Sequence, residues 1–593
     1  MTFHQVLLFI NRMSSSTSCL STPSGKSAST GDACCTWWRD LILITVITGL
    51  WFCALLGVRP LSNPDEGRYT EIPREMAVTG DFVTPRLNGV KYFEKPPLVY
   101  WLSALTFRQF GVSEFTARLW GGLFSIFGVL LTYSAARLIY DRRTGIWSAI
   151  VLSTSLLYYI LSQIMLLDMA VAVTMSGALF SFILAMREPR GKRRFGLFMS
   201  FYAFMALATL SKGLIGFAIP GAVIFLWVLL LNRWRALWPF YPLLGTVLLL
   251  AIAAPWHILA SQANHSAIQQ HDFAWFYFIH EHWLRFTTRI HGRFEPWWFF
   301  LPIFIVGLFP WVFFAKQTLR NSLGGGWKAR SQNAEAWFFL IWVVFIIAFF
   351  SKSQSKLIPY ILPVFPACAV LIGRSMSGLW QGLAGSSYRK SGWAFIVTCL
   401  LMAVAISFYP APKDQPEICS YLPILRVTLG GALLLGAGTT FLALRRKQPR
   451  LMIGAIAISS TIFLLAVNAG AGSFDKASTE KLAKILKPML KPEDRVYSVG
   501  FYCQDLPPYL ERLVSVVDYR GELEFGIDAE PEITSKRFLN RDGFVRQWAE
   551  SGNAYAVVRK SYYDKWFPAS NLPYDVIAQT NRFVLVVKRN SQP

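Results

Sequence analysis

The chain has few charged residues for its length. Only 16% of its 593 residues are Asp, Glu, Lys or Arg, whereas 54% are hydrophobic. A soluble protein of ordinary composition carries about a quarter charged residues. Repeated apolar runs, each of the length that crosses a bilayer, account for the deficit and exclude a large soluble enzyme with a rich core. The sequence therefore predicts a polytopic α-helical membrane protein.

Acidic residues are scarce relative to basic ones. The chain has 34 Asp and Glu against 58 Lys and Arg, a formal net charge of +24. Such an excess could indicate nucleic-acid binding, but the basic residues gather in every second short loop between apolar runs. This is the pattern of loops retained in the cytoplasm. We expect no nucleic-acid partner and a cytoplasmic N-terminus. The basic loops lie at 137–143, 187–194, 233–235, 316–330, 389–390 and 445–450.

Several catalytic signatures are missing from the sequence. It contains no G-x-S-x-G motif and no glycine-rich phosphate loop, which argues against a hydrolase triad and a nucleotide-binding loop. Its eight cysteines show no metal-ligand spacing. Cys419 and Cys503 are both predicted to lie outside, where a disulfide is permitted, and the alternative is that both are unpaired.

Hydrophobic runs divide the chain into three parts. Residues 1–39 are Ser/Thr-rich and predicted to be a disordered extension. Residues 40–470 form the membrane domain, and 471–593 form an outer α/β domain, with strands near 496–502, 513–517, 554–558 and 583–587. About thirteen spans are predicted, at 40–58, 115–137, 144–161, 166–186, 195–211, 213–231, 238–255, 297–315, 336–351, 356–373, 393–410, 424–444 and 451–470. An odd number of spans places the C-terminus outside.

Three outer loops are predicted, at 59–114, 256–296 and 352–356. In the first, the short apolar run 97–111 is predicted to be an interfacial helix rather than a span. Charged residues of both signs lie at either end of this loop, in N-P-D-E-G-R (63–68) and Y-F-E-K-P-P (92–97).

The carboxylates of the first loop are candidate functional groups. Asp65 and Glu66 follow a proline at the outer mouth of the first span, and Glu94 and Lys95 return to the same boundary. Asp168 interrupts an apolar run at the outer start of a span, where an ionisable residue is expensive and is a functional candidate by default. The alternative is a structural ion pair with a neighbouring basic residue, and for Glu66 both readings stay open.

The second loop contains the sequence H-E-H-W-L-R-F (280–286). Glu281 and Arg285 have the i, i+4 spacing of a helical ion pair, which is either functional or structural. His282 is a candidate metal ligand, although no complete ligand set is evident.

Lysines on the outer side form a further group. Lys356, in the third loop, departs from the positive-inside pattern, and Lys212 in L-S-K-G is another outward cation. Such lysines suit an anionic ligand such as a lipid phosphate, and interfacial snorkelling is the alternative. Together with the carboxylates and aromatic residues of the outer loops, they indicate a site for a sugar attached to a phosphate.

At these residues the chain resembles the lipid A aminoarabinose transferases of the GT-C superfamily, which also includes the protein O-mannosyltransferases. The matching stretches run through nearly the whole chain after residue 40. They are D-E-G-R-Y-T-E-I-P-R-E-M (65–76), G-D-F-V-T-P-R-L (80–87), Y-F-E-K-P-P (92–97), S-K-G (211–213), E-H-W-L-R-F (281–286), K-L-I-P-Y-I-L-P (356–363) and Y-R-G-E-L-E-F-G (519–526).

The resemblance implies a GT-C fold with thirteen spans, juxtamembrane helices in the first outer loop and a periplasmic α/β domain. It further implies transfer of aminoarabinose from undecaprenyl phosphate to lipid A in a bacterial inner membrane, with resistance to polymyxin as the result. The roles it implies are essential acids for Asp65 and Asp168, binding of the donor phosphate or lipid for Lys95, Arg68, Tyr92, Tyr360, Lys356 and Lys212, and substrate or structural contacts for Glu94, Glu281, Arg285 and His282. Glu94 is also the candidate ligand of a divalent metal ion.

Two other functions stay open. The first is another polyprenyl-phosphate sugar transferase, such as a protein O-mannosyltransferase, for which a carboxylate general base would be indispensable. The second is a transporter of lipid-linked sugars. Transporters often contain internal repeats with polar sites near the midplane, whereas here no repeat is found and the ionisable residues lie at the outer boundary.

Overall fold

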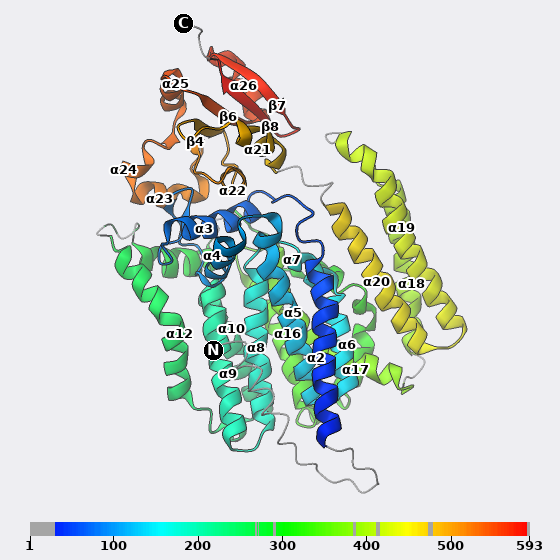
Figure 1. Cartoon of the computed structure of the whole chain (residues 1–593). Helices are drawn as coiled ribbons and strands as arrows, with labels where there is room; N and C mark the ends of the chain where they lie inside the picture. Colours follow the sequence, from blue (N-terminus) through cyan, green and yellow to red (C-terminus); the bar gives the residue numbers. More distant parts are fainter. Residues whose placement is uncertain are drawn as a thin grey trace.

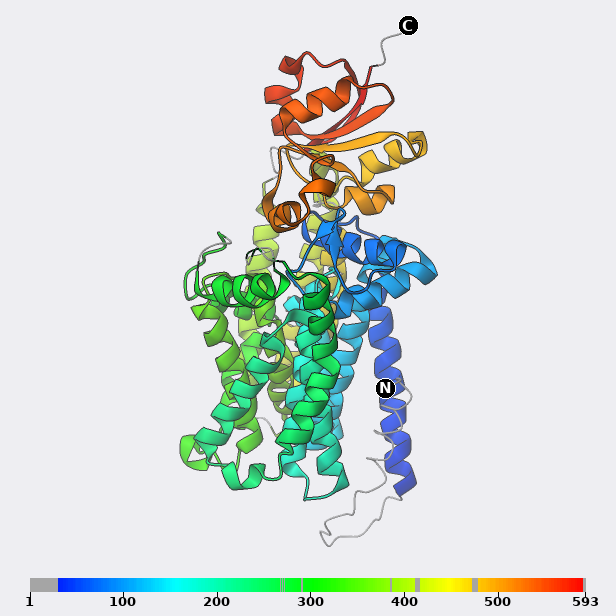
Figure 2. The same ribbon diagram turned by 90° about the vertical axis from the view of Figure 1, so that its left-hand side faces the viewer.

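The protein consists of a helical bundle, a layer of short helices on one end of it, and a small α/β domain on that layer (Figures 1 and 2). The computed structural model describes residues 30–589 apart from 267, 269, 271, 289–291, 384–386, 411–415 and 472–477.

Long apolar helices make up the bundle. Its elements are α2 (Thr30–Cys53), α5 (Glu114–Ile139), α6 (Arg142–Ser153), α7 (Leu156–Ser162), α8 (Asp168–Arg187), α9 (Lys192–Lys212), α10 (Ile215–Leu231), α11 (Trp234–Leu237), α12 (Pro242–Ala263), α14 (Phe300–Gly307), η3 (Trp311–Phe314), α15 (Ala315–Ser322), η4 (Gly326–Ala329), α16 (Ala334–Lys352), η5 (Ile358–Val364), α17 (Phe365–Trp380), α18 (Ser387–Phe408), α19 (Pro416–Arg445) and α20 (Pro449–Ala471). Each of the thirteen predicted spans coincides with a helix or a bent pair of helices.

Within the described residues, nine helices are long and apolar enough to cross a membrane, or up to eleven if each of two bent pairs is one span. The bent pairs are α6 with α7, at 64°, and α14 with η3 and α15, at 96°. The polytopic membrane architecture is thus confirmed, whereas thirteen crossings stay a prediction. Helix α8 is the most buried of the nine, with 89% of its apolar stretch inside the protein, so its first residue, Asp168, stands at the end of a central helix.

The prediction of disorder up to residue 39 is wrong for its last part, because α2 begins at Thr30. Residues 1–29 lie outside the described part of the chain. Asp40 anchors this end of α2, since its carboxylate accepts hydrogen bonds from Arg137 at 2.9 Å and Arg142 at 2.6 Å. Trp37 lies beneath the guanidinium of Arg137, 4.4 Å from the ring centroid. These partners come from other spans, so local Ser/Thr content did not reveal them.

The first outer loop is folded into short elements. Helix α3 (Asp65–Thr79) is followed by a hairpin of β1 (Arg86–Leu87) and β2 (Val90–Lys91), and then by α4 (Leu98–Phe110). The helix predicted over 97–111 is confirmed. The second outer loop contains the π-helix η2 (Trp275–Leu284) and α13 (Arg285–Thr287), and α12 extends into its beginning.

The C-terminal domain is an α/β fold with a six-stranded sheet in the order β5-β4-β3-β6-β8-β7. Strands β3 to β6 are parallel, and β8 and β7 add an antiparallel edge. The four predicted strands are confirmed, and the short β5 and the half-polar edge strand β7 were not predicted. The elements are α21 (Glu480–Leu486), η7 (Lys487–Met489), β3 (Arg495–Val499), α22 (Leu506–Leu510), β4 (Ser515–Val517), η8 (Gly521–Leu523), α23 (Glu524–Ala529), α24 (Pro531–Thr534), β5 (Phe538–Leu539), α25 (Arg541–Ala549), β6 (Ala554–Arg559), α26 (Lys560–Trp566), η9 (Pro568–Ser570), β7 (Tyr574–Gln579) and β8 (Phe583–Lys588).

Cys503 is a buried free thiol, so it is unpaired in this domain. The side chain of Cys419 lies outside the described part of the chain.

The C-terminal domain packs tightly on the first outer loop. A Cβ atom at Gly67 in α3 would lie 2.4 Å from the backbone nitrogen of Asp505, so only glycine permits this approach. Asn88, in the turn of the hairpin, exchanges two hydrogen bonds with the backbone of Val514, at 2.9 and 3.0 Å. Arg86 donates to both carboxylate oxygens of Glu530. The domain is therefore seated by specific polar contacts.

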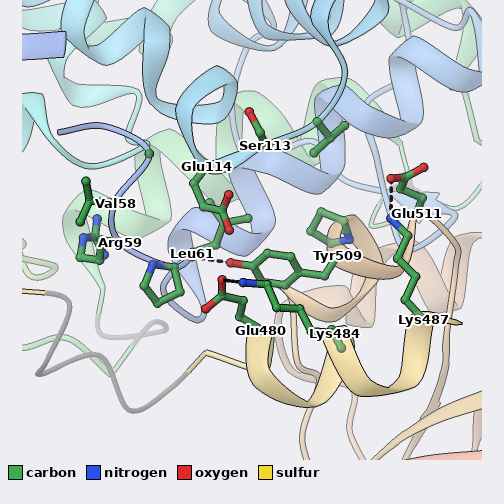
Figure 3. Close-up of a pocket in the computed structure, with 15 residues that line it drawn as sticks. Val58, Arg59, Leu61, Ser113, Glu114, Glu480, Lys484, Lys487, Tyr509 and Glu511 are labelled. Atoms are coloured by element: carbon green, nitrogen blue, oxygen red, sulfur yellow. Dashed lines mark hydrogen bonds and ion pairs between the residues drawn. The ribbon is translucent and has the colours of Figure 1, made fainter. Parts of the chain in front are cut away.

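A pocket of about 460 Å³ lies along this junction (Figure 3). At its centre the Tyr509 hydroxyl accepts a hydrogen bond from the backbone of Leu61 at 2.8 Å. Its lysines are already paired, because Lys484 bonds to Glu480 and Lys487 bonds to Glu511, each at 2.6 Å. The Tyr509–Leu61 hydrogen bond therefore helps to hold the domain on the first outer loop, and both lysines of the pocket have a counter-charge.

Candidate functional site

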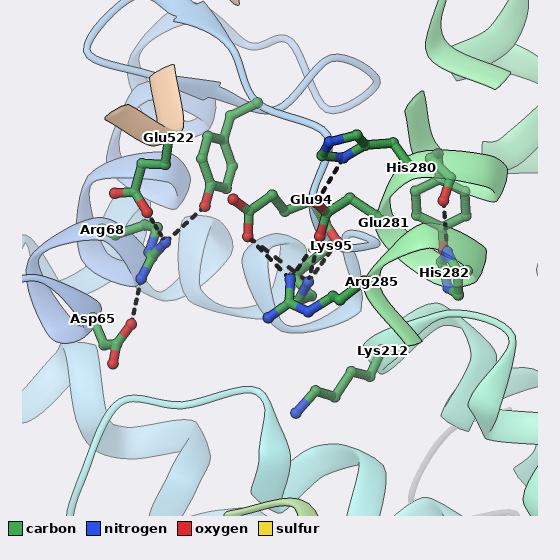
Figure 4. A network of polar contacts seen from close by, with 12 residues as sticks. Asp65, Arg68, Glu94, Lys95, Lys212, His280, Glu281, His282, Arg285 and Glu522 are labelled. Carbon is green, nitrogen blue, oxygen red and sulfur yellow. Dashed lines mark hydrogen bonds and ion pairs between the residues drawn. The ribbon is translucent and has the colours of Figure 1, made fainter. Parts of the chain in front are cut away.

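Charged and aromatic side chains from five segments meet where the bundle ends and the outer layer begins (Figure 4). The segments are the start of α3, the connection between β2 and α4, the start of α8 together with the end of α9, the π-helix η2 with the following α13, and η5. These segments include most of the residues that the sequence singled out, and they lie at the outer ends of the predicted spans.

Arg68 is the centre of the first half of the site. It is buried, and its Nη1 donates to the Tyr92 hydroxyl at 2.8 Å. It also forms ion pairs with Asp65, three residues earlier in α3, and with Glu522 of the C-terminal domain. Burial would lower the pKa of Arg68, but Tyr92 and Glu522 raise it well above the usual value, so this cation stays charged. The Asp65 side chain is 53% exposed and therefore accessible to a ligand.

Lys95 and Arg285 are the cations of the second half. Glu281 is almost fully buried and accepts from Arg285 at 2.7 Å and from Lys95 at 3.5 Å. Glu94 lies 3.7 Å from Arg285 and 3.9 Å from Lys95, so two carboxylates and two cations alternate. Burial and the charge of Arg285 lower the pKa of Lys95 to about 8. The predicted i, i+4 pair of Glu281 and Arg285 is confirmed and belongs to the site.

Asp168 and Lys212 close the site from the bundle side. Asp168 is the first residue of α8 and Lys212 the last of α9, and they form an ion pair. The Lys212 ammonium lies 4.7 Å from the centroid of the Tyr360 ring. The Tyr360 hydroxyl in turn accepts from Arg285 at 3.3 Å, which joins this pair to the second half of the site.

His282 has a structural contact rather than a ligand-like one. Its Nε2 accepts from the backbone N–H of Leu214 at 3.1 Å, and its Nδ1 donates to the Tyr277 carbonyl at 2.6 Å. Burial lowers the pKa of His282 to about 4, so the ring is neutral near pH 7. Gly213 has a φ of +88°, and a Cβ there would lie 2.0 Å from the ring. His282 thus holds the turn that carries Lys212.

Lys356 lies apart from these contacts. Its ammonium donates to the backbone carbonyls of Glu295 and Ser353, each at 2.7 Å. These bonds tie the second outer loop to the third. The structure does not bring Lys356 to the cluster that contains Lys95 and Arg68.

The site does not fit a metal ion. The described residues include no group of three or more His, Cys, Asp or Glu side chains that could hold one. Glu94, the candidate ligand, is flanked by the cations Lys95 and Arg285, whose charge opposes a divalent cation.

Glu66, the neighbour of Asp65, is structural. Its side chain is fully buried and accepts from Arg118 at 2.7 and 2.9 Å, and it pairs with Arg59 at 2.9 Å. Its Oε1 also accepts from the backbone N–H of Met165, three residues before Asp168. Burial alone would raise the pKa of Glu66, but Arg118 outweighs it and lowers the pKa to about 2. The Glu66 carboxylate thus fixes the two segments that carry the candidate acids Asp65 and Asp168.

Glu522 is the site residue that the sequence analysis missed. It is mostly buried between Arg68 and Gln504, and both donate to its carboxylate. The available signal was the stretch 519–526, which resembled a family motif although no role was assigned to a residue within it. Its contact with α3 depends on how the C-terminal domain docks.

The arrangement suits a ligand that carries both charges. Buried cations at a membrane boundary can hold a lipid-linked phosphate, and charge-assisted hydrogen bonds of this kind are the stronger ones. The alternating carboxylates keep these cations oriented and offer acceptors for hydroxyl or ammonium groups of a sugar.

The chain is similar in sequence to known sugar transferases. Residues 482–588 match the model of the aminoarabinose transferase C-terminal domain, and residues 94–259 match that of dolichyl-phosphate-mannose-protein mannosyltransferase. The undecaprenyl phosphate-alpha-4-amino-4-deoxy-L-arabinose arabinosyl transferase of Pectobacterium carotovorum is 30% identical over 93% of this chain and 98% of its own length. The namesake from Proteus mirabilis is 31% identical over 72% of this chain and 75% of its own.

The chain is also similar to solved structures over nearly its whole length. The crystal structure of ArnT from Cupriavidus metallidurans bound to undecaprenyl phosphate has a TM-score of 0.79 and 30% identity, covering 94% of this chain and 98% of that one. The apo structure of the same protein has a TM-score of 0.78. The agreement extends over the bundle, the outer layer and the C-terminal domain together.

Proposed function

Because the chain belongs to the undecaprenyl phosphate-α-4-amino-4-deoxy-L-arabinose arabinosyl transferase family, we propose that it moves this aminosugar from undecaprenyl phosphate to a phosphate of lipid A. It is a membrane glycosyltransferase with the GT-C fold. The basic short loops support a cytoplasmic N-terminus in the inner membrane, with the site and the C-terminal domain in the periplasm.

The cations hold the donor in this proposal. Arg68 and Lys95 bind the phosphate that links the sugar to its carrier, with Tyr92 and Tyr360 beside it. Arg68 is permanently charged, and the buried position of both cations strengthens their attraction for phosphate relative to that in water. The observation that carries the proposal is this pair of buried cations at the outer ends of the spans, with the half-exposed Asp65 next to them.

Transfer then needs one bond made and one broken. An oxygen of the lipid A phosphate attacks the anomeric carbon, and the bond from that carbon to the carrier phosphate oxygen breaks with its electron pair. The attacking oxygen is already anionic at neutral pH, so no strong general base is required. Arg68 and Lys95 stabilise the negative charge of the departing phosphate, and Asp65 and Asp168 orient the acceptor or bind the sugar ammonium.

Capping a lipid A phosphate removes negative charge from the cell surface. Cationic peptides such as polymyxin are attracted by that charge, so the proposed reaction weakens their binding and gives resistance.

The alternative within enzymes is transfer of another polyprenyl-phosphate sugar to a protein hydroxyl, which the match of residues 94–259 favours. Purified protein supplied with the aminoarabinose donor should modify lipid A and leave a Ser/Thr peptide unmodified. Modification of the peptide alone would support the mannosyltransferase reading. No product with either acceptor, despite donor binding, would support the transporter reading.

A further inference from the structure

A polar hollow of about 850 Å³ lies in the C-terminal domain, away from the transfer site. Residues that follow β4 and β5, namely Asp518, Arg520 and Asn540, line one side, and α25 lines the other. In open α/β sheets, ligands bind outside the carboxyl ends of parallel strands. The hollow therefore occupies the part of this fold where ligand sites occur.

The charges around the hollow leave one cation uncompensated. Asp518 accepts from Arg541 at 2.7 Å, and Glu550 pairs with Arg495 at 2.7 Å. Arg520 is paired with Asp528. Arg546, which projects from α25 and is exposed, forms no ion pair or hydrogen bond with any residue in the described part of the chain. An anionic group entering the hollow would find a free guanidinium there.

The remaining lining suits a sugar. Tyr519 presents a half-buried aromatic ring with a polar hydroxyl. The oxygen of the Asn540 amide caps α25, while its NH2 group donates to no residue in the described part of the chain. The Gln547 amide is already bonded to Tyr497 and to the Lys536 carbonyl. Amides and hydroxyls bond to sugar hydroxyls, and an aromatic ring covers the apolar face of a pyranose. A purely apolar ligand would leave the Asn540 NH2 group and the Tyr519 hydroxyl without hydrogen-bond partners.

The hollow and the transfer site are lined by residues that are only two positions apart in the sequence. Arg520 lines the hollow, and Glu522 pairs with Arg68 in the site. Their Cα atoms are at most about 7 Å apart, because an extended chain advances no more than about 3.6 Å per residue. In Figure 1, α25 lies farther from the bundle than α23, and α23 packs on β2 of the first outer loop, so the hollow that α25 lines lies beyond the transfer site on the side away from the bundle.

We propose that this hollow binds a negatively charged saccharide that continues from lipid A on the acceptor, with Arg546 pairing to its phosphate or carboxylate. The proposal rests on the proposed function, since it assumes a lipid A acceptor. Saccharide attached to a membrane-anchored acceptor extends away from the bilayer, in the direction that the hollow takes from Arg68. The hollow then adds affinity for acceptors that carry acidic sugars without touching the reacting atoms.

The test uses the purified full-length protein, the aminoarabinose donor and two acceptors. One acceptor is lipid A alone, and the other is lipid A bearing acidic inner sugars. Arg546→Ala should raise KM about tenfold for the substituted acceptor and leave its kcat unchanged, with no effect on lipid A alone. Arg546→Lys should restore part of the difference, and added salt should reduce it. Arg589→Ala, which removes an exposed arginine at the far edge of the sheet, should behave as the unaltered protein.

Two results would overturn the inference. In the first, Arg546→Ala has the same KM as the unaltered protein for each acceptor. In the second, Arg546→Ala raises KM equally for both acceptors. Failure of the unaltered protein to modify either acceptor would instead contradict the proposed function.

Discussion

Arg68 in the first outer loop and Glu522 in the C-terminal domain form an ion pair across 454 residues of sequence. The C-terminal domain therefore supplies a carboxylate to the same cation that is proposed to hold the donor phosphate. Tyr92 fixes Arg68 from the other side. The domain is thus part of the candidate site as well as a separately folded unit.

Removal of the Glu522 carboxylate should impair sugar transfer, because Arg68 would lose a partner that positions it. We expect Glu522→Ala to lower kcat/KM for the donor by about tenfold to a hundredfold, because small displacements of a positioning group have effects of this size. Glu522→Gln should lose less, since its amide oxygen still accepts from Arg68. Initial rates with purified protein measure this. Glu524→Ala, an exposed neighbour, is the control, and normal activity of Glu522→Ala would show that the contact is dispensable.

The lowered pKa of Lys95 predicts a pH dependence. Lys95 is protonated below about pH 8 and binds phosphate in that form, so kcat/KM for the donor should fall as pH rises through about 8. Lys95→Arg keeps the charge to much higher pH and should shift this fall upward, although with a lower maximum. If kcat/KM of Lys95→Arg fell at the same pH as in the unaltered protein, the titrating group would be another residue.

The buried pair of Glu66 and Arg118 predicts a large effect on stability. Glu66→Gln leaves Arg118 without a counter-charge and should cost about 3–5 kcal/mol of unfolding free energy. The pKa of Glu66 falls from 4.5 to about 2 on folding, so its stabilisation is complete above pH 4.5 and is lost as pH falls toward 2. Thermal unfolding in detergent at pH 7 measures the first effect. Glu493→Gln, in an exposed turn of the C-terminal domain, should be neutral, and an equal loss in both variants would contradict the account.

The close contact of Gly213 with His282 predicts a steric effect on the site. Gly213→Ala would place a methyl group 2.0 Å from the ring and would strain a φ of +88°. Because this turn carries Lys212, activity should fall at least tenfold. Gly221→Ala in α10, where no atom lies within 4 Å of the added methyl, is the matched control. Assays of both variants decide, and normal activity of Gly213→Ala would contradict the positioning role of His282.

The spans were predictable because hydrophobic length is a local property that the bilayer imposes on each segment. Helix α8 was recognisable from its apolar run, and Asp168 stood out in it because a carboxylate there is expensive. The start of α2 was not predictable, since Asp40 and Trp37 depend on arginines from other spans. Composition alone favoured disorder there.

The candidate site was predictable in its residue types but only partly in its pairs. Asp65, Glu94 and Lys95 were found from charge at a membrane boundary. The roles of Glu66 and Glu522 followed only from partners far away in sequence, Arg118 and Arg68. Periodicity and spacing carry no information on such pairs.

Contacts between side chains and backbone groups were also not predictable from the sequence. Lys356 was predicted to bind phosphate, and its charge is instead directed to the carbonyls of Glu295 and Ser353. His282 likewise bonds to backbone groups of Leu214 and Tyr277. A sequence shows which side chains are charged or titratable, but it does not show which carbonyl or N–H faces them.

Mass spectrometry of lipid A from cells that express this protein tests the central claim most directly. The host must make the aminoarabinose donor and lack its own transferase, and an Asp65→Ala variant at equal expression is the control. The account predicts an aminoarabinose-sized addition to lipid A that disappears in Asp65→Ala. Unmodified lipid A, with expression and donor supply both verified, would contradict the assignment of donor and acceptor.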